Sequence, residues 1–222
     1  MTKPLYCILV AVLLLSLTAC QQAPHQRAAD EATSNAESIW TEADRAYLLE
    51  NLTLTKQGLL DATEGLTADQ WRFKSDADTW SIAEVVEHLA LIESYYFRDL
   101  LYGQYTPERP ELVAQVTGND EAFVAYENDP GTATAALYAT PTGMFETGDE
   151  LMNYFTRFRD QVIELVTSTD SDLRLHFAYR APGSGIWEAR DLHQYTLTLI
   201  SHAARHTNQI NRIKTAANYP GR

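Results

Sequence analysis

Cysteine is scarce in this sequence. The 222 residues contain two cysteines, Cys7 and Cys20, and both lie near the N-terminus. The chain beyond Cys20 therefore has no thiol, which excludes disulfide cross-links and a cysteine nucleophile from that part of the protein. Its core must be stable without covalent cross-links, and any thiol in its chemistry must come from a substrate.

Positive charge is also scarce. The chain has 17 lysines and arginines against 30 aspartates and glutamates, which gives a formal net charge of −13 at pH 7. A chain of this charge repels nucleic-acid phosphates and anionic lipid headgroups. We therefore expect no nucleic-acid partner and interpret the acidic surface as one that keeps an exported protein soluble.

Several familiar catalytic motifs are missing. The sequence has no nucleophile elbow of a Ser-His-Asp hydrolase, no P-loop, no dinucleotide-binding glycine motif and no Cys-x-x-Cys pair. It also shows no internal repeat and no set of strands large enough to predict a sheet. These absences exclude the enzyme classes that depend on those motifs and favour a helical fold.

The N-terminus has the pattern of a secretory signal. Lys3 is followed by an apolar run from Leu5 to Leu17, and small residues precede the cysteine in Leu17-Thr18-Ala19-Cys20. The run is too short for a typical transmembrane helix. Its end resembles the lipobox of bacterial lipoproteins, which implies that residues 1–19 are a signal peptide and that Cys20 is acylated, with the lipid bilayer as partner. The alternative is an ordinary signal peptide or a membrane anchor.

The residues after Cys20 bear on localisation and domain organisation. Gln21 and Gln22 follow it with no adjacent aspartate, which in a Gram-negative cell resembles outer-membrane sorting. We expect a lipid-anchored protein of the cell envelope, facing the periplasm in such a cell.

Residues 20–38 are polar without an apolar period and predict a flexible tether. Residues 39–222 then form one domain, large enough for a hydrophobic core.

Four segments of this domain have the apolar spacing of amphipathic helices. They begin near residues 41, 81, 147 and 188 and extend to about residues 63, 102, 165 and 217. Ser81 with Glu84 and Thr147 with Glu150 form capping boxes, and Thr41 is a candidate N-cap. The pattern predicts an all-α fold: a four-helix bundle with long crossover loops that differs from simple up-down-up-down order.

The links between these segments are long. Residues 64–80 contain three large aromatics and are expected to pack as an ordered lid over one end of the bundle. Residues 103–146 are rich in proline and glycine and include a candidate short helix near 119–127. Residues 168–187 include a turn-rich stretch at 181–185.

Three histidines are candidates for a shared site. His202 and His206 lie on the apolar stripe of the last predicted helix, and His88 borders the stripe of the second. Side chains four residues apart lie about 5–6 Å apart on one helix face. A third imidazole from a facing helix would complete a three-nitrogen metal site with one open position. The residues alone leave two interpretations, a metal site or hydrogen-bonded core histidines.

Two motifs carry a family resemblance. They are Trp80-Ser81-Ile82-Ala83-Glu84-Val85-Val86-Glu87-His88-Leu89 and His202-Ala203-Ala204-Arg205-His206-Thr207-Asn208-Gln209-Ile210. Their content, order and separation resemble the DinB-like superfamily, which includes the YfiT-like proteins and the bacillithiol and mycothiol S-transferases, over about residues 41–216. The resemblance implies a DinB/YfiT-like bundle whose His88, His202 and His206 bind a divalent metal. Zn²⁺ and Ni²⁺ suit this ligand set best.

The resemblance implies an activity as well. It favours a metal-dependent transferase that uses a small thiol, or a metal-dependent hydrolase, with a small molecule as substrate. The alternative is a non-enzymatic envelope module that binds metal or a partner on the same scaffold, and a third interpretation is a bundle without metal. DinB-like bundles often dimerise, so a homodimer is a candidate state.

Four further residues are candidates for roles at the site. Glu84, one turn before His88, could orient an imidazole or take a proton as a catalytic residue, or only cap its helix. Gln209, one turn after His206, could orient a ligand or form a hydrogen bond at the bundle end. Arg159 and Arg205 could meet an anionic substrate or belong to ion-paired faces.

The remaining histidines and three tryptophans have weaker claims to a site. We interpret the histidines as structural or surface residues because they lack a partner at a useful spacing: His25, His176 and His193. The tryptophans are expected to be core or lid aromatics, or to line a pocket: Trp71, Trp80 and Trp187.

Overall fold

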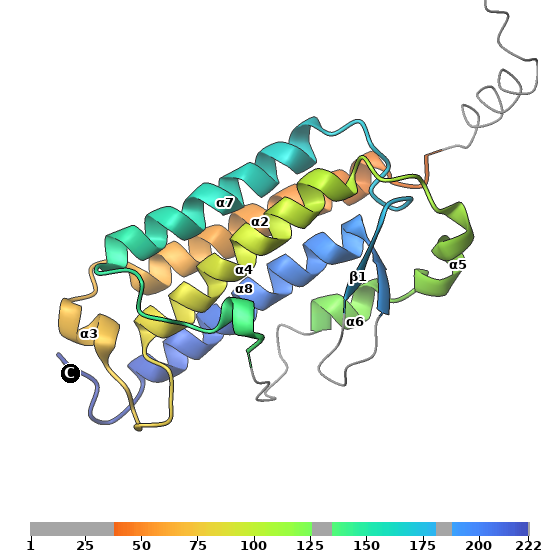
Figure 1. The fold of residues 1–222 in the computed structure, drawn as a ribbon. Coiled ribbons are helices and arrows are strands. Elements are labelled where there is room, and N and C mark those ends of the chain that lie inside the picture. Colours follow the sequence, from red (N-terminus) through yellow and green to blue (C-terminus); the bar gives the residue numbers. More distant parts are fainter. Residues whose placement is uncertain (1–37, 126–134, 181–187, 222) are drawn as a thin grey trace, which may run out of the picture. The chain divides into compact units, whose positions relative to one another are not determined.

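Four long helices lie side by side in the protein (Figure 1). The computed structural model describes residues 38–125, 135–180 and 188–221. Its long helices are α2 (Glu42–Thr63), α4 (Ile82–Gly103), α7 (Gly148–Ser168) and α8 (Leu192–Lys214). The predicted all-α bundle is confirmed. The signal sequence with Cys20, almost all of the predicted tether, His25 and Trp187 lie outside the described residues.

Side-chain caps determine where the first three long helices begin. Thr41, Ser81 and Thr147 each accept a hydrogen bond from the backbone N–H three residues later, and the acidic side chain at that later position accepts one from the cap residue. Each reciprocal box satisfies two amides that have no partner within the helix. The helices start where these local signals predict.

The last long helix begins later than expected. Residues 188–191, predicted to be helical, form strand β2 (Glu188–Asp191), which pairs antiparallel with β1 (Phe177–Arg180). A two-stranded sheet therefore forms where we expected no sheet. The pairing provides hydrogen-bond partners for the backbone of this segment. The Asp191 side chain then caps α8 by accepting a hydrogen bond from the Gln194 N–H. Helix α8 also ends at Lys214, earlier than the predicted residue 217.

The helices follow an up-down-down-up order. Helix α2 begins beside the end of α7, where Arg45 donates to the Val166 carbonyl, and α4 and α7 run in the same direction (Figure 1). The link between α4 and α7 must therefore return along the bundle. Among its described residues it contains four short elements: η1 (Pro110–Leu112), α5 (Val113–Val116), α6 (Asp120–Ala125) and η3 (Leu137–Ala139). Helix α6 lies within the predicted 119–127 segment.

Residues 64–80 pack over the end of the bundle where α7 begins. They contain the short helix α3 (Ala68–Arg72), which has its own capping box. Phe73 meets Tyr219 edge to face, with ring centroids 5.3 Å apart. The Trp71 ring lies against Gly148, where an added Cβ would come within 2.2 Å of the indole. Only glycine leaves room for this tryptophan at the start of α7.

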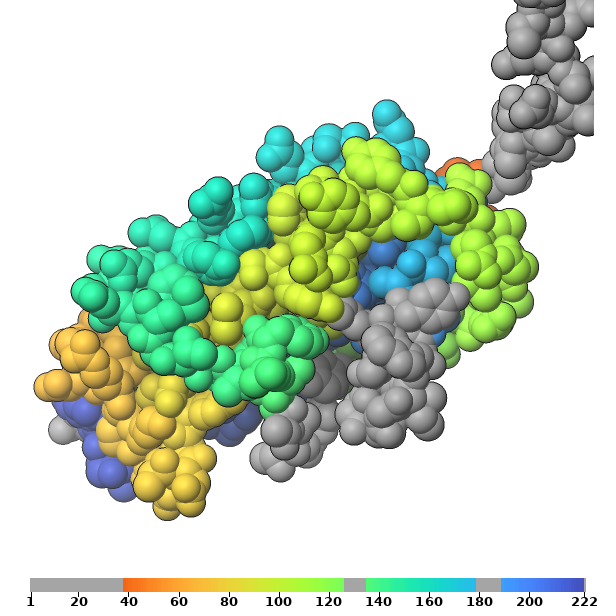
Figure 2. Space-filling model, viewed as in Figure 1, coloured from red at the N-terminus to blue at the C-terminus, as the bar shows by residue number. Residues whose placement is uncertain are grey.

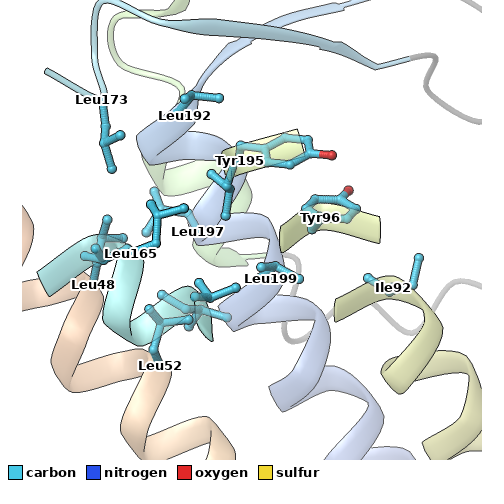
Figure 3. Close-up of a cluster of buried hydrophobic side chains, with 14 of the residues drawn as sticks. Leu48, Leu52, Ile92, Tyr96, Leu165, Leu173, Leu192, Tyr195, Leu197 and Leu199 are labelled. Carbon is cyan, nitrogen blue, oxygen red and sulfur yellow. The ribbon is translucent and has the colours of Figure 1, made fainter. Parts of the chain in front are cut away.

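Buried apolar side chains form two clusters along the bundle. The cluster shown in Figure 3 joins side chains from all four long helices. Tyr96 of α4 and Tyr195 of α8 stack there with ring centroids 4.1 Å apart. The second cluster lies toward the end covered by residues 64–80 and includes Phe155 and Ile210. No helix in the described ranges is both long and apolar enough to span a membrane.

A buried ion pair connects the four helices. Arg159 of α7 is fully buried, and its guanidinium donates to both carboxylate oxygens of Glu93 on α4. It also donates to the Leu52 carbonyl (3.2 Å) and the Thr55 hydroxyl (2.7 Å) on α2, and to the Leu199 carbonyl (3.4 Å) on α8. Burial raises the pKa of the Glu93 carboxyl, and the adjacent Arg159 opposes that shift. Every part of the guanidinium is thus engaged within the core.

Breaking this pair should destabilise the bundle strongly. We expect Arg159→Met or Glu93→Gln to lower the free energy of unfolding by about 3–5 kcal/mol, because each leaves a buried polar or charged partner unpaired. Urea unfolding followed by circular dichroism measures the change. The more exposed ion pair between Lys56 of α2 and Asp160 of α7 provides the control: Asp160→Asn should cost no more than about 1 kcal/mol. Equal losses in the two experiments would contradict the central role of Arg159.

Candidate metal centre

Three imidazoles converge between two antiparallel helices. His88 comes from the second turn of α4, and His202 and His206 come from successive turns of α8. The Nε2 atom of His202 lies 3.1 Å from that of His88 and 3.2 Å from that of His206. One ligand atom from each ring lies within 4.8 Å of the others. The structure thus brings together all three histidines that the sequence singled out.

The second ring nitrogen of two of these histidines has its own partner. His88 Nδ1 lies 2.7 Å from the Ala139 carbonyl, and His206 Nδ1 lies 2.7 Å from Gln209 Oε1. Both oxygens can only accept, so each Nδ1 carries the proton and each Nε2 is left with a free lone pair. Such contacts orient metal-ligating imidazoles in proteins. Gln209 therefore makes the contact that an orienting residue requires.

Burial keeps the imidazoles neutral. It lowers the pKa of His88, and the hydrogen bond to the Ala139 carbonyl opposes that shift only in part. It lowers the pKa of His206 to about 3, with His88 as the next cause. The pKa of His202 is also well below its usual range, through burial and then through the other two imidazoles. Neutral imidazoles are the form that binds metal ions.

The donor set fits a divalent cation. With Nδ1 protonated in His88 and His206, only His202 can place a proton on Nε2, and it can direct that proton to only one neighbour. At least one of the two short nitrogen–nitrogen contacts is then left without a hydrogen bond. A cation removes this conflict. Tetrahedral coordination at about 2.0–2.1 Å places nitrogens about 3.3 Å apart, close to the observed 3.1 and 3.2 Å.

The long crossover supplies part of this site. Glu87, only 3% exposed, accepts hydrogen bonds from the Thr142 N–H (2.8 Å), the Thr142 hydroxyl (3.0 Å) and the Gly143 N–H (2.9 Å). Gly143 has a φ of 71°, in the region that favours glycine. This anchor holds the segment whose Ala139 carbonyl meets His88. Figure 2 shows residues 135–147, in green to teal, at the surface beside the yellow residues of α4.

Sequence reasoning missed Glu87 and Ala139. The available signal for Glu87 was a charged residue inside the apolar run Val85-Val86-Glu87-His88-Leu89, where a carboxylate must find buried partners. No sequence signal indicates Ala139, because its backbone carbonyl makes the contact and every residue type carries one.

Glu84 makes the contacts of a helix cap. Its Oε2 accepts from the Ser81 N–H (2.7 Å) and hydroxyl (3.0 Å), and its Oε1 pairs with Lys74 at 2.8 Å. Within the described part of the chain, its carboxylate makes no hydrogen bond to an imidazole. Of the roles considered from the sequence, the geometry favours capping over orienting or catalytic ones.

The other candidate residues are distributed through the fold. Arg159 is engaged in the core, which excludes it from contact with an anionic substrate. The Trp80 ring lies beside His88, with centroids 5.1 Å apart. His176 and His193 are both buried. Helix α6 and its Asp120 cover His193, which makes it a structural residue and not a surface one.

A comparison with protein families supports this site. A model of the DinB superfamily matches residues 51–210, which is more than half of the chain and includes the three histidines. The chain belongs to the DinB superfamily. Comparisons with curated proteins and with solved structures give no significant match. The site is therefore that of a DinB-type protein with three histidines suited to a divalent metal.

Gln209 provides a test of this geometry. We expect Gln209→Leu to raise the Kd for a divalent metal about 10–100-fold, because His206 loses the acceptor that orients its ring. Calorimetric titration of metal-free protein with Zn²⁺ measures the constant. The adjacent Asn208 is exposed, so Asn208→Leu is the matched control and should bind as the wild type does. An unchanged Kd in Gln209→Leu would contradict the orienting role.

Acidification should destabilise the metal-free protein. The three imidazoles have lowered pKa values in the folded state and an ordinary value of about 6.5 when unfolded. Below that pH the unfolded chain binds more protons, so the free energy of unfolding falls by up to about 1.4 kcal/mol per pH unit for each imidazole. The contribution of these imidazoles to the free energy of unfolding is complete above about pH 6.5. It is lost as the pH falls toward the pKa of each imidazole in the folded protein, which is about 3 for His206.

Urea unfolding between about pH 7 and pH 5 measures this dependence. A variant with His202→Asn and His206→Asn lacks two of the three imidazoles but keeps every carboxylate of the wild type. The difference between the two proteins therefore reports the imidazoles alone. Its unfolding free energy should fall less steeply with acid. The same slope in both proteins would show that the imidazoles titrate normally when folded.

Proposed function

We propose that this protein is a metal-dependent enzyme of the cell envelope that transfers a small thiol or hydrolyses a small substrate. The observation that carries the proposal is the convergence of three Nε2 atoms, with the protons of two rings held on Nδ1. This set leaves one coordination position for a reactant, as in catalytic rather than structural metal sites.

Each residue of the centre has a definite role in this proposal. His88, His202 and His206 would hold Zn²⁺ or Ni²⁺. When bound, such an ion acts as a Lewis acid that favours the deprotonated form of water or of a thiol. Gln209 and the Ala139 carbonyl keep the Nδ1 protons away from the ion. The chain beyond Cys20 has no cysteine, so a reacting thiol has to enter as a substrate.

One ligand is less buried than the other two. His202 is half-buried, whereas His88 and His206 are buried. Trp80 and the crossover segment lie against His88. The proposal therefore assigns the open coordination position to the side of His202.

We further propose that the protein is exported and held at a membrane by acylation of Cys20. The basic start, the apolar run and the Leu17-Thr18-Ala19-Cys20 ending support this proposal. The polar residues that follow would act as a tether between the lipid and the domain. Envelope location means that the thiol or hydrolysable substrate is one found outside the cytoplasm.

Replacing the ligands should remove the metal. We expect His88→Ala, His202→Ala and His206→Ala each to lose most of the bound metal and all metal-dependent turnover, with helical content kept. His176 is equally buried but lies outside the cluster, so His176→Asn is the control and should keep its metal. Elemental analysis of stripped and reloaded protein measures stoichiometry. Assays of thiols with electrophiles and with ester and amide substrates measure turnover.

The outcomes separate three functions. Metal lost from the histidine variants together with turnover supports the enzyme. Metal binding without turnover on any substrate pair would favour the non-enzymatic binding module. Unchanged metal content in all three alanine variants would refute the site itself and leave a metal-free bundle.

A further inference from the structure

A cleft lies between the C-terminal halves of α4 and α7, which run side by side in the same direction (Figure 1). Its volume is about 420 Å³, which is within the range of small-molecule sites in proteins. Phe97, which lines the cleft, follows His88 by nine residues, or about 14 Å along the axis of α4. The cleft is therefore separate from the candidate metal centre.

Part of the cleft wall is apolar and aromatic. Phe97 and Leu101 of α4 and Leu165 of α7 contribute to this part. Tyr105, just beyond the end of α4, also lines the cleft and is 76% exposed. An aromatic ring can hold either an apolar group or a cation. This wall fits the apolar body of a small ligand.

The charged side chains of the cleft are all negative. Glu164 of α7 and Asp170, just beyond that helix, line the cleft, and both are exposed. Within the described ranges, neither carboxylate forms a hydrogen bond or an ion pair. No lysine, arginine or histidine among those residues lines the cleft. The charge of this site therefore favours a cation.

The two helix ends at the cleft add to its negative potential. Neither α4 nor α7 has a basic residue in its last turn, so the partial negative charge at each C-terminus is not offset within the helix. Arg45 of α2 donates to the carbonyls of Val166, Thr167 and Thr169 from outside the cleft. It offsets the end of α7 in part, and the end of α4 and the two carboxylates stay unbalanced.

An amide without a partner indicates which kind of cation fits. Gln161 lines the cleft, and its Oε1 is buried with no hydrogen-bond partner among the described residues. A buried acceptor without a donor is destabilising, and the terminal torsion of a glutamine turns easily. A primary ammonium group carries three N–H donors, which can serve this oxygen as well as carboxylates. A quaternary ammonium group carries none.

We propose that this cleft binds a small primary amine, in which an ammonium group is attached to a short apolar or aromatic body. The ammonium group lies against Glu164 and Asp170 in charge-assisted hydrogen bonds, with Gln161 as a further acceptor. The body packs against the aromatic and apolar wall. This site goes beyond the proposed function and does not depend on a metal.

Calorimetric titrations of the full chain test the proposal. The three probes share a phenyl ring and differ in charge: 2-phenylethylamine, 2-phenylethanol and 3-phenylpropanoate. At neutral pH we expect the protonated amine to bind with a Kd of about 1 mM or lower, within reach of a ligand of this size. The neutral alcohol should bind at least about tenfold more weakly, and the carboxylate should not bind.

A double variant removes the negative charges of the cleft and keeps the side-chain shapes. With Glu164→Gln and Asp170→Asn, the Kd of the amine should rise at least about tenfold, as for loss of a charged hydrogen bond. The Kd of the alcohol should stay unchanged. The matched control combines Glu50→Gln with Glu64→Gln, two exposed glutamates that do not line the cleft. It has the same net charge and should bind the amine as the wild type does.

Gln161→Met distinguishes a binding role from a structural one. It removes the acceptor that has no partner, so the urea midpoint should not fall, whereas the Kd of the amine should rise about threefold or more. A residue kept only for the fold would show a lower midpoint and an unchanged Kd, and that result would contradict the role of Gln161.

The remaining outcomes decide between this site and others. The proposal is overturned if the amine does not bind, if the alcohol binds equally well, or if the two double variants weaken binding equally. His202→Ala should bind the amine as the wild type does, and loss of binding there would place the amine at the metal centre instead. A wild type that binds the amine but no metal would refute the proposed function and support this site.

Discussion

The buried guanidinium of Arg159 is the constraint on which this structure depends. From α7 it contacts the three other long helices, through Glu93, Leu52, Thr55 and Leu199. Burying this pair carries a large desolvation cost, and only full pairing within the core offsets it. Sliding or rotating any helix would break one of these contacts. The pair thereby specifies the relative register of the helices, which apolar packing alone specifies less strictly.

This register determines the geometry of the histidines. Glu93 follows His88 by just over one helical turn, and Leu199 precedes His202 by just under one turn. The same guanidinium therefore joins α4 and α8 close to the point where the imidazoles meet. A shift of one ångström between these helices would change the 3.1 Å separation of the His88 and His202 nitrogens by up to about a third. The core ion pair and the candidate metal centre are in this way parts of one arrangement.

The surroundings of the candidate centre determine the protonation state of its three imidazoles. Burial keeps the imidazoles neutral, and two oxygen acceptors, from Ala139 and Gln209, hold protons away from the converging nitrogens. One acceptor comes from the same helix as its histidine, and the other comes from the long crossover. Glu87 holds that crossover in place. The loop that appears in the sequence as a proline-rich connection is thus part of the site.

Several features followed from the sequence because they depend on local chemistry. The starts of α2, α4 and α7 were predictable from Thr41, Ser81 and Thr147, since a cap and its partner lie three residues apart. The three candidate ligands followed from one-turn spacing on α8 and from the family motifs, and the structure brings their rings together. The start of α8 was predicted wrongly because Glu188–Asp191 finds its partner in Phe177–Arg180, and local spacing does not report such pairing.

The sequence by itself determined the four amphipathic helices, the caps of the first three and the identity of three metal-ligand candidates, because these depend on residue type and short-range spacing. Only the tertiary structure decided that Arg159 is a core residue. It also decided that the Ala139 carbonyl belongs to the centre. These roles depend on contacts between segments that are distant along the chain, and such contacts exist only after the helices have packed.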